Sequence, residues 1–205
     1  MKPSKKIALS VLVVGLGLLT WGALTANQGP SHLKAGDVFP LTRLQNIHDS
    51  EVVIPNANVK FVHLQFRRFA GCPICNLHLH TFIQRYPEIQ SAGIQEVVLF
   101  HSSKAALLPY QGSFPFDVVG DPEKKLYVQF GVQSSIFSIL NPSVWPTIFK
   151  ANSETDKPNG DPEGGPLGLP ADLLISPEGK VVASHYGRHA YDQWSVDELL
   201  ALAKQ

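Results

Sequence analysis

The chain has 205 residues, enough for one domain of ordinary size plus an additional segment. Its 17 lysines and arginines balance its 17 aspartates and glutamates, and no basic stripe marks a nucleic-acid-binding surface. Its 2 cysteines cannot build a framework of several disulfides, which excludes the disulfide-rich scaffolds. We therefore expect a small-molecule or protein partner and no nucleic acid.

The N-terminal segment indicates where the protein resides. Lysines precede an uncharged, mostly apolar stretch from Ile7 to Ala26, and the next charge is Lys34. Such a stretch, as a helix, spans a bilayer core of about 30 Å, and the preceding lysines favour the cytoplasmic side. We expect a single-pass anchor in the cell membrane, with the rest of the chain on the extracytoplasmic side. A cleaved signal peptide is the alternative, but its apolar region is usually shorter and residues 23–26 form a poor cleavage site.

The composition after the anchor predicts a linker and then one domain. Residues 27–36 contain Gly, Pro and Ser, which are typical of a linker before a domain over 37–205. Short apolar pieces alternate with turn residues over 37–58 and predict a small hairpin. The run Val59 to Phe66 is rich in β-branched and aromatic residues, which predicts the first core strand.

The two cysteines lie where this strand gives way to a helical pattern. Cys72 and Cys75 are separated by two residues, and Pro73 suits the first turn of a helix, where its missing N–H is not needed. A thiol at a helix N-terminus meets unpaired N–H groups and the positive end of the helix dipole, which lower its pKa. The pattern predicts a redox dithiol, whose sulfur must be accessible to a substrate.

The remaining elements alternate between strands and helices. Cys75, Leu79 and Phe82 recur at helical spacing, and Pro87 should end or kink this helix. We expect further strands over 94–100, 114–119, 172–175 and 181–185, and further helices over 102–110, 122–130 and 195–204. This order predicts an α/β fold in which helices flank a central mixed sheet.

An insertion near 133–169 interrupts the alternation. It is rich in Pro, Gly, Ser and Asn, and we expect a loop without regular structure. Loops of this length are often functional, for example as a lid or a partner surface, but the sequence does not identify the role of this one. Trp145 and Phe149 in this segment could cover the site, although a pair of aromatic residues more often belongs to a core.

Four motifs together resemble a known family. They are the stretch from Arg67 to Cys75, the stretch from Phe116 to Pro122, Gly168-Leu169-Pro170-Ala171, and the stretch from His185 to Asp192. The dithiol at the start of a helix after a core strand, together with Gly168-Leu169-Pro170-Ala171, is similar to the thioredoxin fold. More closely, the other three stretches resemble the peroxiredoxin-like branch of the alkyl hydroperoxide reductase and thiol-specific antioxidant family, and this similarity covers residues 35–204.

This resemblance implies a role for each cysteine. Cys72 would attack a peroxide and become a sulfenic acid, and Cys75 would resolve it as a Cys72–Cys75 disulfide that an external thiol reduces. Pro170 resembles the cis-proline that faces the dithiol and pairs with a bound substrate. Phe69 stands where typical peroxiredoxins have a Thr or Ser that holds the peroxide, so other residues must supply the polar contacts here.

Arginines are the candidates for these contacts. Arg67 and Arg68 are adjacent and should face opposite sides of the strand, so at most one points at the sulfur and the other is a solvated surface charge. Arg188, with His189 and Asp192, could form a polar cluster near the site. Asp192 could equally cap the following helix.

Two other functions remain open from the sequence. The dithiol could exchange disulfides with proteins, or the domain could be a non-enzymatic redox-sensing or metal-carrying module. Cys72, Cys75, His78 and His80 supply metal donors, but on a helix the two histidines point about 200° apart. Haem attachment would require a histidine at position 76, which is Asn76. We expect no metal and no cofactor.

Overall fold

The computed structural model describes residues 32–132, 134–135, 142–154 and 163–205. The predicted anchor over 7–26 and most of the linker lie outside these residues. Within the described part of the chain, no helix has the length and apolar character needed to cross a membrane.

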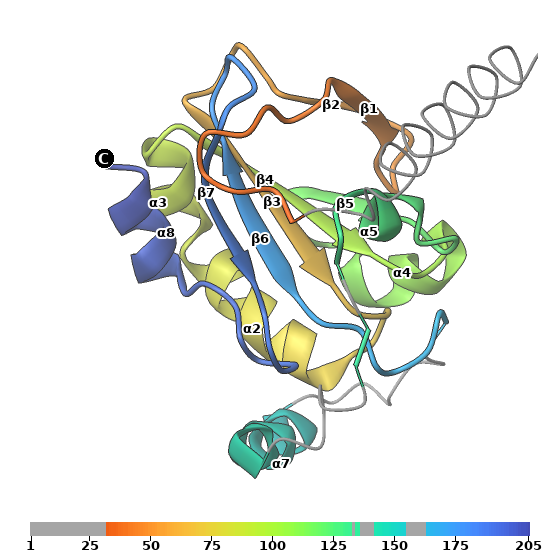
Figure 1. Cartoon of the computed structure of the whole chain (residues 1–205). Helices are drawn as coiled ribbons and strands as arrows, with labels where there is room; N and C mark the ends of the chain where they lie inside the picture. The colour runs from red at the N-terminus through yellow and green to blue at the C-terminus, as the bar shows by residue number, and fades with distance from the viewer. Residues whose placement is uncertain (1–31, 133, 136–141, 155–162) are drawn as a thin grey trace, which may run out of the picture. The chain divides into compact units, whose positions relative to one another are not determined.

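A five-stranded sheet with the order β5-β4-β3-β6-β7 organises the domain (Figure 1). Its strands are β3 (Phe61–Arg67), β4 (Ile94–Phe100), β5 (Asp117–Gly120), β6 (Ala171–Ile175) and β7 (Val181–Tyr186). Strands β3, β4 and β5 run parallel, whereas β6 pairs antiparallel with both β3 and β7. The predicted mixed sheet is confirmed.

The predicted hairpin covers one face of this sheet. Strands β1 (Thr42–Gln45) and β2 (Glu51–Ile54) pair antiparallel. Ile54 of the hairpin and Phe130, which follows α5 (Lys125–Gln129), belong to one buried cluster with Phe66 of β3. This face of β3 is wholly apolar.

Helices cover the opposite face (Figure 1). They are α2 (Pro73–Gln84), α3 (Tyr86–Ser91) and α8 (Val196–Leu202), while α4 (Lys104–Gln111) packs against β5. Helix α2 ends before Pro87, as predicted, and Pro87 lies in the first turn of α3. Ser195 caps α8 in a capping box with Glu198.

Strand β5 and helix α5 each begin three residues later than the sequence predicts. Strand β5 begins at Asp117 rather than at residue 114. Helix α5 begins at Lys125 rather than at residue 122, because Lys124 adopts a left-handed conformation with φ +56 and the Asp121 carboxylate accepts the first helical N–H groups.

The segment 133–169 contains structure that the sequence did not predict. A short 3₁₀ turn η1 (Pro142–Val144) leads into helix α7 (Trp145–Glu154), which packs against α2. Trp145 and Phe149 are 52% and 72% exposed, so the expectation that this pair belongs to the core is wrong.

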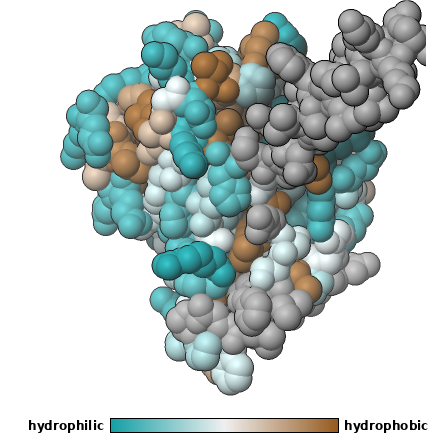
Figure 2. All heavy atoms as spheres, in the orientation of Figure 1, coloured by the Kyte–Doolittle hydropathy of each residue, from teal (hydrophilic) through white to brown (hydrophobic). Residues whose placement is uncertain are grey.

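The face of the molecule in Figure 2 is mainly hydrophilic, with separate hydrophobic patches.

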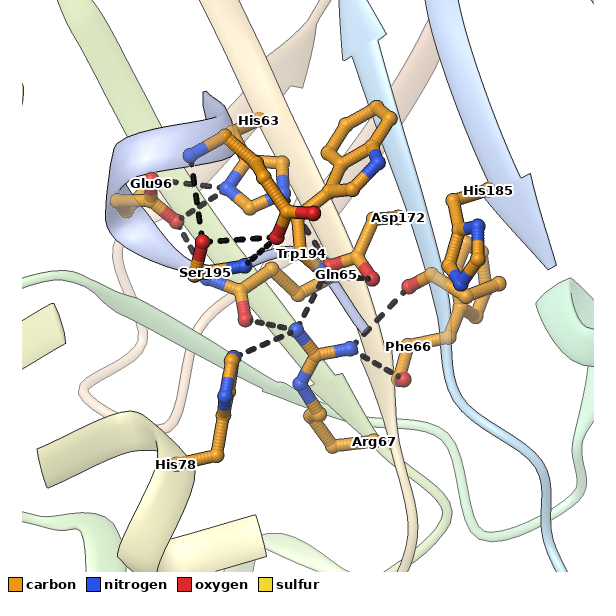
Figure 3. A network of polar contacts seen from close by, with 12 residues as sticks. His63, Gln65, Phe66, Arg67, His78, Glu96, Asp172, His185, Trp194 and Ser195 are labelled. Carbon is orange, nitrogen blue, oxygen red and sulfur yellow. Dashed lines mark hydrogen bonds and ion pairs between the residues drawn. The ribbon is translucent and has the colours of Figure 1, made fainter. Parts of the chain in front are cut away.

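A buried polar network lies between the sheet and α2 (Figure 3). His63, Gln65 and Arg67 alternate along β3 onto this face and are 0% exposed. Arg67 Nη2 donates to Asp172 Oδ1 of β6 at 2.7 Å, and His63 Nδ1 lies 2.9 Å from Glu96 Oε1 of β4. The expectation that the arginine facing away from the sulfur is solvated is therefore wrong, because Arg67 pairs inside the core.

The charges in this network balance only when His63 is protonated. Burial opposes the charged imidazole, but Glu96 and Asp172 outweigh burial and raise the pKa of His63 to about 9. Burial also opposes the Asp172 carboxylate, but Arg67 and His63 lower its pKa below the usual value. Two cations thus neutralise two carboxylates in the core.

We expect this network to lose stability as the pH rises from about 6.5, the pKa of histidine in an unfolded chain, towards about 9. In this range the folded state binds one more proton than the unfolded state, so the free energy of unfolding falls. Ionisation of the thiols acts in the opposite direction, and the measurement therefore uses a Cys72→Ser/Cys75→Ser variant. Below about pH 7 the buried histidines with a lowered pKa, His78 and His101, also act in the opposite direction. The urea unfolding midpoint is therefore compared at about pH 7.5 and about pH 9 and should be lower at pH 9. An equal or higher midpoint at the alkaline pH contradicts a protonated His63.

Candidate active site: a buried dithiol beside Arg68

A tight turn carries the chain from β3 into α2. Gly71 has φ +68, a left-handed conformation that glycine adopts without strain, and the Cys72 N–H donates to Phe69 O at 3.2 Å. The Ala70 N–H donates to Ser102 Oγ at 3.0 Å, which ties the turn to the end of β4. The turn therefore holds Cys72 at the start of the helix.

Cys72 is the N-cap residue of α2. Its Sγ accepts the N–H of Cys75 at 3.4 Å, and Pro73 occupies the first turn, as predicted. Cys75 Sγ lies 2.7 Å from Cys72 Sγ, and both thiols are free. A disulfide bond is about 2.05 Å long, so once an oxidant removes two electrons, only a small movement of the sulfurs is needed to join them.

Arg68 supplies the cation of the site. Its Nη2 donates to Cys72 Sγ at 3.0 Å, and its Nη1 donates to Pro166 O at 2.9 Å. Arg67 points into the polar network instead, so the prediction that at most one of these arginines faces the sulfur is confirmed. Arg68 is only 4% exposed, which leaves its charge poorly screened by solvent.

Both sulfurs are buried, with 0% of Cys72 and 2% of Cys75 exposed. They share a core cluster with Phe69 and with Val144, which precedes α7. The sequence predicted a sulfur that a substrate can reach, whereas in this structure a substrate reaches it only after a covering segment moves.

The pair carries one negative charge near neutral pH. Burial opposes ionisation, but the hydrogen bond from Cys72 and the charge of Arg68 lower the pKa of Cys75 to about 6. Burial and the neighbouring Cys75 raise the pKa of Cys72. The sequence predicted a lowered pKa for Cys72, at the start of the helix, whereas in the structure the lowered pKa falls on Cys75. Transfer of the shared proton from Cys72 to Cys75 places the charge on Cys72, beside Arg68.

Pro170 and Arg188 line a pocket of about 320 Å³ with His32, Leu169 and Tyr186, among others, and neither cysteine lines this pocket. The Leu169–Pro170 bond is not cis, since the described residues contain one cis bond, Ile54–Pro55; the expectation of a cis-proline is wrong. The substrate-binding roles of Pro170 and Arg188 remain predictions.

Asp192 forms a small polar cluster with residues near the end of β7. Its carboxylate lies 2.8 Å from His185 Nε2 and accepts the Arg188 N–H at 2.8 Å. Ser195, rather than Asp192, caps α8, so the helix-cap alternative is wrong. Within the described ranges, no group of three His, Cys, Asp or Glu side chains could hold a metal ion.

Sequence reasoning missed three residues that shape the site. Tyr127 Oη lies 2.5 Å from Arg67 O and 2.9 Å from Leu99 O, and it thereby joins the ends of β3 and β4. Ser102 holds the turn, and His101 donates its backbone N–H to Arg68 O at 3.1 Å. A signal was present, because the carboxyl ends of adjacent parallel strands meet, so residues that follow 94–100 should neighbour those that follow 59–66.

We expect Arg68→Met to raise the pKa of the dithiol, because its thiolate then loses the adjacent cation. Ultraviolet absorbance of the thiolate measures this without requiring a reagent to reach the sulfur. In the unmodified protein the absorbance should rise with a midpoint near the Cys75 pKa of about 6, and the variant should shift it upward by at least about 1 unit. Arg188→Met, which changes an exposed arginine, is the control. Equal midpoints in all three proteins would show that Arg68 does not stabilise the thiolate.

Comparisons with known proteins identify the family and the fold. The family model described as AhpC/TSA antioxidant enzyme matches residues 81–189 of the chain. The match begins after the dithiol, so the site geometry and the family match are separate observations. No curated protein sequence matches the chain.

Solved structures with low sequence identity share the fold. Peroxidoxin BcpB from Mycobacterium tuberculosis has a TM-score of 0.62 at 16% identity, over 84% of this chain and 97% of its own. A cysteine-to-serine mutant of peroxiredoxin 6 from Arenicola marina has a TM-score of 0.58 at 16% identity, over 84% and 72%. A Chlorobium tepidum structure described as a putative thiol:disulfide interchange protein DsbE has a TM-score of 0.53 at 19% identity, over 83% and 99%. The chain has a thioredoxin-like fold and belongs to the AhpC/TSA antioxidant enzyme family.

Proposed function

We propose that this protein is a thiol-dependent peroxidase of peroxiredoxin type, with Cys72 as the nucleophile and Cys75 as the resolving thiol. The observation that carries the proposal is the contact of Arg68 with Cys72 Sγ at 3.0 Å, beside a second thiol at 2.7 Å. A cation stabilises the nucleophilic thiolate, and a neighbouring thiol can convert its oxidised form into a disulfide.

The reaction needs three balanced steps. The Cys72 thiolate attacks one peroxide oxygen, the O–O bond breaks, and the departing oxygen takes a proton to leave as an alcohol or water. The Cys75 thiol then attacks the Cys72 sulfenic acid, which forms the Cys72–Cys75 disulfide and releases water. An external dithiol reduces this disulfide and is itself oxidised.

Two features of the site support the resolving step. The sulfurs are already neighbours, so no unfolding of α2 is required. Because Cys72 is 0% exposed and Cys75 is its neighbour, Cys75 meets the sulfenic acid before an external thiol does.

Exchange with protein disulfides is the second candidate function. A CxxC pair at a helix N-terminus also suits that reaction, in which a thiolate attacks a disulfide sulfur. The burial of both sulfurs favours the peroxide, because a small oxidant needs less opening of the structure than a protein disulfide does.

With dithiothreitol as reductant, we expect the full chain to consume hydrogen peroxide, and Cys72→Ser to abolish consumption because the nucleophile is lost. Cys75→Ser should still form the sulfenic acid, which dimedone traps, but no disulfide. Reduction of insulin disulfides without consumption of peroxide would instead establish the second candidate function. Peroxide consumption that survives Cys72→Ser contradicts the assignment of the nucleophile.

We also propose that residues 7–26 anchor the protein in the cell membrane, with the domain on the extracytoplasmic side. The uncharged segment after three lysines supports this proposal. On membranes that carry the full chain, carbonate extraction should leave it in the pellet, and external protease should reach the domain. A soluble chain that lacks the N-terminal residues would support a cleaved signal peptide and contradict the anchor.

A further inference from the structure

Two buried polar atoms, one on the arginine that contacts Cys72 and one on a histidine that neighbours this arginine, have no hydrogen-bond partner among the described residues. They are Arg68 Nε, which carries a hydrogen, and His101 Nε2. Arg68 is 4% exposed and His101 is 1% exposed, so bulk water does not satisfy these atoms. Unpaired buried polar groups are rare and costly, and they often mark a functional site.

The hydrogen bond at the other ring nitrogen fixes the role of His101 Nε2. Nδ1 of His101 lies 2.8 Å from the carbonyl oxygen of Glu163, so Nδ1 carries the hydrogen and donates it. Burial and the nearby cations Lys124 and Arg68 lower the pKa of His101, which keeps the ring neutral. Nε2 therefore offers a free lone pair, an acceptor that matches the free donor on Arg68.

Both side chains flank Gly168. A Cβ at Gly168 would lie 2.9 Å from His101 Nε2 and 3.4 Å from Arg68 Cγ. The other nitrogens of the same guanidinium contact Cys72 Sγ and Pro166 O. The side chains that carry the unpaired donor and the unpaired acceptor thus meet at Gly168, and the guanidinium of one of them contacts the nucleophile.

Phe69 completes the surroundings of these two groups. Its ring centroid is 5.6 Å from Arg68 Cζ and 6.4 Å from the centroid of His101. By the sequence resemblance, Phe69 stands at the position where typical peroxiredoxins have a Thr or Ser that holds the peroxide. The site therefore lacks that hydroxyl but has an imidazole acceptor beside the phenylalanine.

We propose that His101 Nε2 and Arg68 Nε form the subsite for the hydroperoxide group, which makes His101 a catalytic residue. A hydroperoxide, ROOH, has one O–H hydrogen to donate and oxygens that accept, which is the complement of these two atoms. The inference deepens the proposed function and depends on it.

His101 also transfers a proton while Cys72 attacks the peroxide. As the Cys72 thiolate forms a bond to the terminal peroxide oxygen, Nε2 takes the hydrogen of that oxygen, and the electron pair of the O–O bond goes to the departing oxygen. Nε2 then delivers the same proton to this oxygen, which leaves as ROH. The sulfur is oxidised to a sulfenate, the peroxide is reduced, and His101 returns to its neutral form.

The segment 163–168 closes this subsite in the structure. Glu163 accepts from His101 through its carbonyl and from the Ser103 N–H through its carboxylate at 2.6 Å, and Pro166 O accepts from Arg68. Gly164 and Gly165 have φ +73 and +86. A peroxide that approaches His101 Nε2 must displace Gly168, so the subsite is complete only when this segment yields.

The test compares two reactions of the reduced full chain, purified in detergent: oxidation by hydrogen peroxide and alkylation by iodoacetamide. Both need the thiolate, but only the peroxide has an O–H for His101. We expect His101→Asn, whose amide can still donate to Glu163 O, to slow oxidation at least about 10-fold while alkylation is unchanged. His101→Gln, which places an amide oxygen near the position of Nε2, should recover part of the loss. His80→Asn, at an exposed histidine of α2, should react like the unmodified protein.

The unmodified protein provides an independent measurement, should the variants not fold. It should react with tert-butyl hydroperoxide much faster than with di-tert-butyl peroxide, which has no O–H, after each rate is divided by that of free cysteine. Equal normalised rates, or oxidation that His101→Asn leaves unchanged, overturn the role of His101. Parallel loss of oxidation and alkylation in both His101 variants does so as well, because it shows a structural effect. An unmodified protein that alkylates but does not react with peroxide contradicts the proposed function itself.

Discussion

The contact between the Arg68 guanidinium and Cys72 Sγ is the interaction on which the site depends. Burying a thiolate is costly, and without an adjacent cation a dithiol that is almost fully buried would stay protonated and inert. The dithiol is therefore both sheltered and ionised. The same arginine donates to Pro166 O, so the group that stabilises the thiolate also holds the segment 163–168 in place.

Two adjacent arginines at the end of β3 do different work because side chains alternate along a strand. Arg67 points to the helix-covered face, where it pairs with Asp172, and Arg68 begins the turn and reaches the sulfur. Helix α2 therefore packs over paired charges on one face of β3, while the opposite face of β3 is apolar. The fold thus places the Arg67 cation in the core and the Arg68 cation beside the reactive sulfur.

The sequence was sufficient for the strands, the helix at Cys72 and the mixed sheet, because those features follow from local periodicity and from proline positions. It failed over 133–169, because the Pro, Gly, Ser and Asn around helix α7 indicate a loop, whereas the helix packs against α2. It also failed for Arg67, although His63, Gln65 and Arg67 repeat with the period of a strand. The burial of the thiols and the position of His101 depend on strand neighbours and on residues 163–168, which no local pattern encodes.

The most direct test of a cation-stabilised dithiol that reacts with peroxide is a mass spectrum of the reduced full chain after one equivalent of hydrogen peroxide. The account predicts the loss of two hydrogen atoms and a peptide map in which Cys72 and Cys75 are joined within one chain. An unchanged mass, under conditions in which the unfolded chain is oxidised, would contradict it.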